Sequence, residues 1–156
     1  MSTHMGGGMD KWRFKSEVDG LSIQAYRWRC AVSRPKQVVI IAHGACEHVM
    51  RYQRFARVLN AHGIEVLGLD HRGHGESLTE LGPMDFGSGG WDGLVEDLRT
   101  FISKAKTDYP GIPCVLFGHS MGSFAAQQYC LQSSQDIDAL ILSGSTALQI
   151  QPEELA

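Results

Sequence analysis

Ten consecutive residues decide the fold of this chain: Pro113-Cys114-Val115-Leu116-Phe117-Gly118-His119-Ser120-Met121-Gly122. The first five are typical of a buried strand, and the small residues Ala125 and Ala126 follow in a helical pattern. A serine between two glycines at such a junction predicts a turn so tight that the serine backbone is strained and a side chain at either glycine would collide. The serine hydroxyl would then stand at the N-terminus of the next helix, where backbone N–H groups favour developing negative charge. We therefore predict that Ser120 is a nucleophile; the alternative is a glycine-rich turn with an incidental serine.

Strand and helix patterns alternate along the rest of the chain. The apolar periodicity predicts strands at 38–42, 64–69, 113–117 and 139–143, and helices at 52–59, 91–105 and 121–131. Before them, residues 12–18 and 21–30 flank Asp19-Gly20, a strong signal for a β-hairpin. We expect an α/β fold: a mainly parallel, doubly wound sheet with helices on both faces and an N-terminal antiparallel hairpin.

Three loops leave the carboxyl ends of the predicted parallel strands, where such sheets bind ligands: 43–48, 70–77 and 118–122. Acyl transfer needs two N–H donors aimed at the developing oxyanion, and we predict the amides of Ala45 and Met121 for this role. His43 is interpreted as a structural histidine that bonds loop backbone rather than as a base. The residues assigned to the substrate pocket are His43, Gly44, Cys46 and His119.

The loop at 70–77 (DHRGHGES) contains two histidines, an arginine and two acids. Its spacing is poor for a metal site, and its glycines favour a rigid structural turn in which Asp70 and Arg72 bond backbone or each other. No metal and no organic cofactor is expected. The four cysteines are widely spaced, and we expect buried free thiols in a reducing compartment. Cys46 either shapes the pocket wall or is a reactive thiol, and we favour the wall.

Composition excludes several classes of function. The chain has 156 residues, 43% of them hydrophobic, and a net charge of -3 without a basic stripe, which argues against nucleic acid as a partner. No apolar run is long enough to cross a bilayer, and no apolar secretory stretch stands at the N-terminus, so we expect a cytoplasmic protein. Residues 1–9 (MSTHMGGGM) are expected to be an artificial leader, residues 10–148 a core, and residues 149–156 the start of a lid.

Three motifs in order, HGxxEH, DHRGHGxS and GHSMG, resemble the α/β-hydrolase fold and, more narrowly, its monoacylglycerol lipase and lysophospholipase branch. The resemblance covers residues 12–148. It implies a serine carboxylic-ester hydrolase with Ser120 as nucleophile and Ala45 and Met121 in the oxyanion hole, acting on an acylglycerol, a lysophospholipid or a similar single-chain ester. Cys46 stands where the branch has a second glycine.

In this fold the catalytic acid and histidine follow the serine, but all seven histidines precede Ser120. Asp136 and Asp138 come before the strand at 139–143, at the wrong end of the sheet, and are not expected to be the triad acid. We therefore expect an N-terminal half that lacks the lid and the C-terminal strands, that is inactive alone, and that needs a companion chain. Contact with a membrane would come through the missing lid.

Two alternatives remain open at this stage. The first is other chemistry of the same fold, such as carbon–carbon hydrolysis, a lyase or a perhydrolase. The second is a catalytically incomplete fragment that only binds an acyl ligand or a protein.

Overall fold

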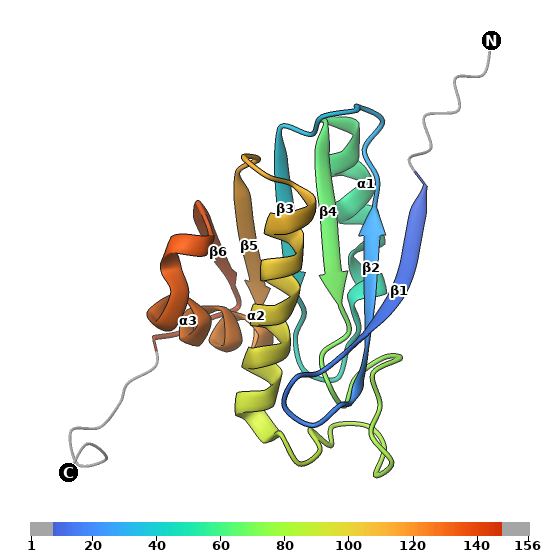
Figure 1. Cartoon of the computed structure of the whole chain (residues 1–156), viewed down its shortest axis with the longest axis vertical. Helices are drawn as coiled ribbons and strands as arrows, with labels where there is room; N and C mark the ends of the chain where they lie inside the picture. The colour runs from blue at the N-terminus through green and yellow to red at the C-terminus, as the bar shows by residue number, and fades with distance from the viewer. Residues whose placement is uncertain (1–7, 148–156) are drawn as a thin grey trace.

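The computed structural model describes residues 8–147, so residues 1–7 of the expected leader and the expected lid start at 149–156 lie outside it (Figure 1). Six strands form one sheet in the order β1-β2-β4-β3-β5-β6. The strands are β1 (Met9–Lys15), β2 (Ser22–Trp28), β3 (Gln37–Ala42), β4 (Ile64–Leu69), β5 (Cys114–His119) and β6 (Ala139–Ser143). The helices are α1 (Gln53–Ala61), α2 (Gly90–Asp108) and α3 (Met121–Ser133), with short 3₁₀ turns η1 (Val49–Tyr52) and η2 (Ser134–Asp136).

This architecture confirms the predicted α/β class. Strands β4, β3, β5 and β6 are parallel, whereas β1 pairs antiparallel with β2, and β2 pairs antiparallel with β4. Helices α2 and α3 cover one face of the sheet and α1 covers the other (Figure 1). The parallel arrangement brings the carboxyl ends of β3, β4 and β5 to one edge, and the three glycine- and histidine-rich loops leave the sheet there.

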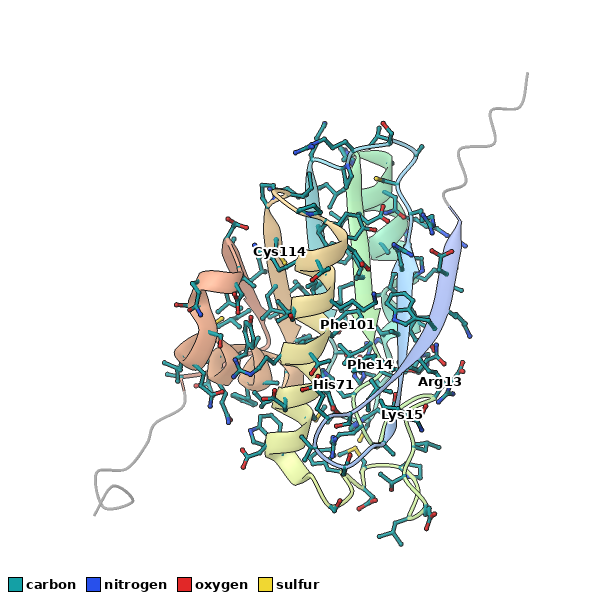
Figure 2. All side chains as sticks on the ribbon, in the orientation of Figure 1. Arg13, Phe14, Lys15, His71, Phe101 and Cys114 are labelled. Atoms are coloured by element: carbon teal, nitrogen blue, oxygen red, sulfur yellow. The ribbon has the colours of Figure 1, made fainter. Side chains whose placement is uncertain are left out.

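The central strand β3 shows why both faces are covered. Its residues alternate between two apolar clusters: Val38 and Ile40 pack toward α2 and α3, whereas Val39 and Ile41 pack toward α1. All four are buried, as expected for a strand in the middle of a doubly wound sheet. Helix α2 adds a long apolar stripe to the first cluster, and its Phe101 stacks on Phe14 of β1 with ring centroids 6.1 Å apart (Figure 2).

The N-terminal hairpin is confirmed, but its turn is longer than the two residues Asp19-Gly20. It spans residues 16–21 and is closed by the Ser16 N–H, which donates to the Leu21 carbonyl at 2.8 Å. The Asp19 carboxylate in this turn also bonds outside the hairpin: it accepts a hydrogen bond of 2.9 Å from Nη1 of Arg72. Gly20 allows the chain to turn there, with φ at +74°.

The two edges of the sheet differ in character. On β1 the exposed side chains alternate with half-buried ones, and three of the exposed residues are cationic: Lys11, Arg13 and Lys15. On β6 the exposed side chains are apolar: Leu140, Ile141 and Leu142 are 37%, 48% and 40% exposed. No helix between residues 8 and 147 has the length and apolar character that crossing a membrane requires.

Candidate active site

Ser120 lies on a strained bend between β5 and α3. Its φ is +49° and its ψ is -119°, a combination that L-residues rarely adopt. The bend is tied to the neighbouring strand, because the Ser120 N–H donates to the carbonyl of Ser143 at 2.9 Å. These torsions are those of a tight strand-to-helix turn, not of a helix interior.

The glycines on both sides of Ser120 are required by contacts with backbone. A Cβ on Gly118 would lie 2.7 Å from the Gly122 carbonyl oxygen and 2.8 Å from Cα of Ser123. A Cβ on Gly122 would run into the carbonyl oxygens of Ala42 and His43 at the end of β3. Backbone cannot move aside as a flexible side chain can, so both positions need glycine, as the sequence predicts.

The loop after β3 lies directly against this bend. A Cβ on Gly44 would come 3.2 Å from Cβ of Ser120 and 3.2 Å from Cδ2 of His119. Ala45 and Cys46 follow on the exposed tip of the loop, while Met121 is the first residue of α3 and is half-buried. The structure thus brings together the two segments from which the oxyanion donors were predicted.

Glu47 anchors this loop, a role that the sequence analysis missed although Glu47 belongs to the HGxxEH motif. Its Oε1 accepts hydrogen bonds from the Gly44 N–H at 2.6 Å and from the Tyr52 hydroxyl at 2.7 Å, and its Oε2 pairs with Arg51. Burial raises the pKa of the Glu47 carboxyl, but the bonds from Tyr52, Gly44 and Arg51 outweigh burial and lower it below its usual value. The carboxylate is therefore held ionised beside the loop.

His43 is fully buried beneath the loop and makes two hydrogen bonds to backbone. Its Nδ1 lies 2.7 Å from the Gly44 carbonyl oxygen, and its Nε2 accepts the N–H of His71 at 3.0 Å. A carbonyl can only accept and an amide N–H can only donate, so the proton of the ring must be on Nδ1. Burial lowers the pKa of His43 to about 4, which keeps the ring neutral. This is the structural histidine expected from the sequence.

Two further histidines pack around His43. The ring centroids of His43 and His71 are 4.6 Å apart, and those of His43 and His74 are 5.3 Å apart. His71 is fully buried, and neither of its ring nitrogens has a partner among the described residues. Burial, with His43 and His74 nearby, lowers the pKa of His71 well below its usual value. The buried His71 ring in the loop after β4 is therefore neutral.

Asp70 and Arg72 fix the loop at 70–77 but do not bond each other. The Asp70 carboxylate accepts the backbone N–H groups of Val49 and Glu76 at 2.9 Å, which confirms the expected bonding to backbone. Arg72 bonds backbone as well, since its Nη1 donates to the Phe86 carbonyl at 3.0 Å, and it also reaches across the fold to Asp97 of α2 and Asp19 of the hairpin. These two carboxylate partners could not be predicted from the sequence, because they lie far from Arg72 along the chain.

Cys46 and His119 occupy different surfaces. The Cys46 thiol is exposed, not buried as expected for the cysteines; it lies 3.7 Å from Sδ of Met84 and lines a cavity of about 340 Å³. Of the other cysteines, all free, Cys30 and Cys114 are buried and Cys130 is half-buried. Cys46 is exposed because it stands on the loop tip at φ +57°.

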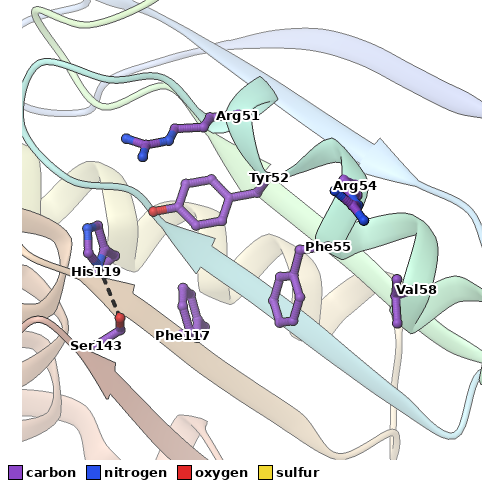
Figure 3. Close-up of a pocket in the computed structure, with 8 residues that line it drawn as sticks. All are labelled: Arg51, Tyr52, Arg54, Phe55, Val58, Phe117, His119 and Ser143. Carbon is purple, nitrogen blue, oxygen red and sulfur yellow. Dashed lines mark hydrogen bonds between the residues drawn. The ribbon is translucent and has the colours of Figure 1, made fainter.

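His119 points to the other side, where its Nδ1 lies 3.1 Å from Oγ of Ser143 (Figure 3). It lines a groove of about 490 Å³ between α1 and the ends of β5 and β6. The groove has an apolar floor and an arginine rim, and its other lining residues are Arg51, Tyr52, Arg54, Phe55, Val58, Phe117 and Ser143. His119 therefore does not turn its ring toward the Ser120 hydroxyl as a base would.

Asp138 lies at the opposite end of the sheet from Ser120. Its carboxylate accepts the N–H of Cys114, at the start of β5, and Asp136 accepts the hydroxyl of Tyr129. Both acids are thus placed as the sequence analysis expected. Within residues 8–147, no three side chains of the types His, Cys, Asp and Glu are grouped as a metal site would need.

The solved structure of another protein shares this architecture. The structure superposes on a thermostable carboxyl esterase from Bacillus coagulans with a TM-score of 0.82 and 30% identity, over 90% of this chain and 45% of that one. Together with the sheet order and the glycine-flanked serine, this similarity defines an α/β-hydrolase fold, of which the described residues form a part.

The family follows from the sequence comparison. Residues 33–155 match the model of the serine aminopeptidase S33 hydrolases, and the chain belongs to that family. It is 38% identical to monoacylglycerol lipase of Mycolicibacterium smegmatis over 70% of this chain, and 36% identical to human monoglyceride lipase over 70% of this chain. The chain spans 38% and 34% of the lengths of these two relatives.

Proposed function

We propose that this chain provides the nucleophile and the oxyanion hole of a serine esterase that acts on acylglycerols or similar single-chain acyl esters. The observation that carries the proposal is the bend at Ser120, with φ +49° and ψ -119°, between two glycines that cannot carry a side chain. A strained backbone persists only where the surrounding structure enforces it, and such strain concentrates at functional sites. The lipase names of the relatives support the substrate class.

In the proposed reaction, Oγ of Ser120 attacks the ester carbonyl carbon while a histidine from a companion polypeptide accepts the hydroxyl proton. The carbonyl oxygen becomes an oxyanion held by the N–H groups of Ala45 and Met121. The tetrahedral intermediate collapses as the C–O bond to the alcohol breaks, and the histidine gives its proton to the leaving alkoxide. Water then attacks the acyl-enzyme by the same steps and releases the carboxylic acid.

The exposed strand β6 supports a companion polypeptide. Leu140, Ile141 and Leu142 are about as apolar as β3 yet stand open to solvent at the sheet edge. The groove next to β6 exposes Phe55 and Val58 of α1, which are 39% and 54% exposed, on the face of the sheet that only α1 covers. Further strands, a helix and the missing acid and base would cover this surface. The companion is proposed as a second chain or a further segment of the same protein.

A fluorophosphonate probe tests the proposed nucleophile. The chain assembled with its companion is expected to gain one covalent adduct at Ser120, and Ser120→Ala abolishes both the adduct and hydrolysis of p-nitrophenyl esters. Ser103→Ala, a change at an exposed serine on α2, is the matched control and keeps both. An adduct at another residue, or an unlabelled Ser120 in the assembled protein, would refute the nucleophile.

A substrate panel tests the reaction class. Monoacylglycerols and lysophospholipids are expected to be turned over faster than aminoacyl arylamides, vinylogous diketones and cyanohydrins. Preferred cleavage of arylamides would favour a peptidase, as the family's description allows, and cleavage of diketones or cyanohydrins would favour a hydrolase of carbon–carbon bonds or a lyase.

A further inference from the structure

The peptide group between Gly44 and Ala45 carries the proposed oxyanion donor, the N–H of Ala45, and its carbonyl belongs to Gly44. The structure contains no cis peptide bond among the described residues, so this C=O and this N–H point in opposite directions. Whatever holds the carbonyl therefore sets the direction of the amide. A rotation of this single peptide plane would turn the amide away from the site and present a carbonyl oxygen to it.

The carbonyl of Gly44 is held from below by His43. The 2.7 Å bond from Nδ1–H of His43 pulls the oxygen toward the buried ring, so the N–H of Ala45 lies on the opposite side, on the exposed tip of the loop. The preceding peptide is held as well, because the Gly44 N–H donates to Oε1 of Glu47 at 2.6 Å. Both peptide planes that meet at Gly44 are therefore fixed, although glycine itself gives them freedom to rotate.

The bond from His43 exists only in one tautomer, and the loop after β4 selects it. The His71 N–H donates to Nε2 of His43 at 3.0 Å, which leaves the ring proton on Nδ1. In the other tautomer Nδ1 would face the Gly44 carbonyl with a lone pair, and Nε2–H would face the His71 N–H. Both pairs of groups would then repel.

From this geometry we infer that His43 is a positioning residue for the oxyanion hole: its Nδ1–H, set by the backbone N–H of His71, fixes the 44–45 peptide so that the Ala45 amide faces the site. The inference rests on the proposed function of Ser120, and it deepens that proposal by naming what prepares the oxyanion donor before substrate arrives. His43 does not touch substrate in this role, since it is fully buried.

Burial keeps the ring of His43 neutral. His71 and His74 pack against it, and the acids nearest to it are Asp70 and Glu47, which are occupied by bonds to Val49, Glu76, Gly44 and Tyr52. None of these acids is hydrogen-bonded to the His43 ring. Their charges and the Gly44 carbonyl favour a second ring proton, but burial outweighs them and lowers the pKa of His43 to about 4.

The tautomer is tested directly on this chain by ¹⁵N NMR of the imidazole ring at pH 7. Cross-peaks between the ring nitrogens and carbon-bound protons are expected to show a protonated Nδ1 and a bare Nε2 at His43. A protonated Nε2, or a doubly protonated ring, would overturn the inference. This measurement does not depend on any enzymatic activity.

Two isosteric variants of the assembled protein separate the two ring nitrogens. His43→Asn places an amide N–H near the position of Nδ1 and can still donate to the Gly44 carbonyl. His43→Gln reaches only the position of Nε2, where it accepts from His71 and leaves the carbonyl without its donor. We expect His43→Gln to lower kcat about 10²–10³-fold with little change in KM, the effect of losing one oxyanion donor, and His43→Asn to recover most of that loss.

Binding of a trifluoromethyl ketone, which forms an oxyanion on Ser120, extends the test. Its affinity should fall for His43→Gln in proportion to kcat/KM, while a non-reactive ether analogue of the substrate binds unchanged. Equal kinetics for the two variants, or an equal loss of affinity for ketone and ether, would overturn the inference. If the wild-type assembly itself fails to hydrolyse esters, the proposed function fails instead, and the NMR result still decides the tautomer.

Discussion

Nε of Arg72 donates to Oδ2 of Asp97 at 2.8 Å, and the two side chains are only 0% and 1% exposed. This ion pair joins the loop after β4 to helix α2, and Asp19 of the hairpin completes it from a third element. Burial raises the pKa of Asp97 above its usual value, although the bond from Arg72 acts to lower it. Burial also acts to raise the pKa of Asp19, which lies near the surface. Hydrogen bonds from Arg72 and from backbone N–H groups outweigh that effect and lower the pKa of Asp19 to about 2. The buried Arg72 thus connects the loop after β4, helix α2 and the hairpin through ion pairs.

Arg72→Met is expected to destabilise the chain by about 3–5 kcal/mol, because it leaves the Asp97 carboxylate buried without its cationic partner. Urea unfolding at pH 7 measures the loss. The double variant Arg72→Met with Asp97→Leu should recover much of it, since no charge then remains buried. A loss below about 1 kcal/mol for the single variant would show that the pair contributes no more than a surface salt bridge.

Gly122→Ala is expected to lower the free energy of unfolding by about 1–3 kcal/mol or more, because the new methyl group meets backbone oxygens at the end of β3. It should also disturb the bend at Ser120, two residues away. Gly8→Ala is the control, since a Cβ there has nothing within 4 Å and should leave stability unchanged. Equal stability of the two variants would mean that the close approach of α3 to β3 is not maintained in solution.

The buried histidines predict a loss of stability in weak acid. The pKa of such a histidine is lower in the folded than in the unfolded chain, so on acidification the unfolded state takes up the proton first. The free energy of unfolding is therefore at its maximum above pH 6.5 and falls as the pH drops toward 4. The slope is about 1.4 kcal/mol per pH unit for each such histidine.

His71→Leu tests this prediction because it removes one imidazole with two unpartnered nitrogens. Its unfolding free energy should match or exceed that of the wild type at pH 7 and should depend less steeply on pH between 6.5 and 4. Carboxylates that titrate in the same pH range contribute equally to both proteins, so their contribution cancels when the two unfolding free energies are subtracted. Parallel pH curves would show that His71 is already solvated in the folded chain.

Ile141→Lys is expected to reduce self-association of the isolated chain, because it places a charge on the apolar edge strand. Light scattering after size exclusion measures the association, and the stability should change little since the residue is 48% exposed. Leu131→Lys, on α3 and 80% exposed, is the matched control and should leave association as it is. If the two variants behave alike, β6 is not the surface through which the chain associates.

The fold could be predicted well from the sequence, because the local patterns of apolar residues and glycines agree with the tertiary structure. Apolar runs such as residues 38–42 are typical of a strand covered on both faces, and glycine positions such as Gly118 and Gly122 specify the tight turn. Chain order then limited the topology, because parallel strands joined by helices place successive loops at one edge of the sheet.

Features that depend on distant partners were not predictable. Arg72 could not be paired with Asp97 without knowing which face of α2 meets the loop, and its bond to Asp19 of the hairpin was hidden for the same reason. Exposure of Cys46 depends on a loop-tip conformation at positive φ, which a cysteine rarely adopts. The tautomer of His43 depends on a single backbone N–H, 28 positions further along the chain.

The two edges of the sheet differ in how readily they pair with a further strand. The exposed lysines and arginine of β1 disfavour pairing with a further strand, whereas the exposed aliphatic side chains of β6 favour it. Pairing of two chains through β6 would leave the charged β1 edges outermost, so the association would end at a dimer instead of extending into a fibre.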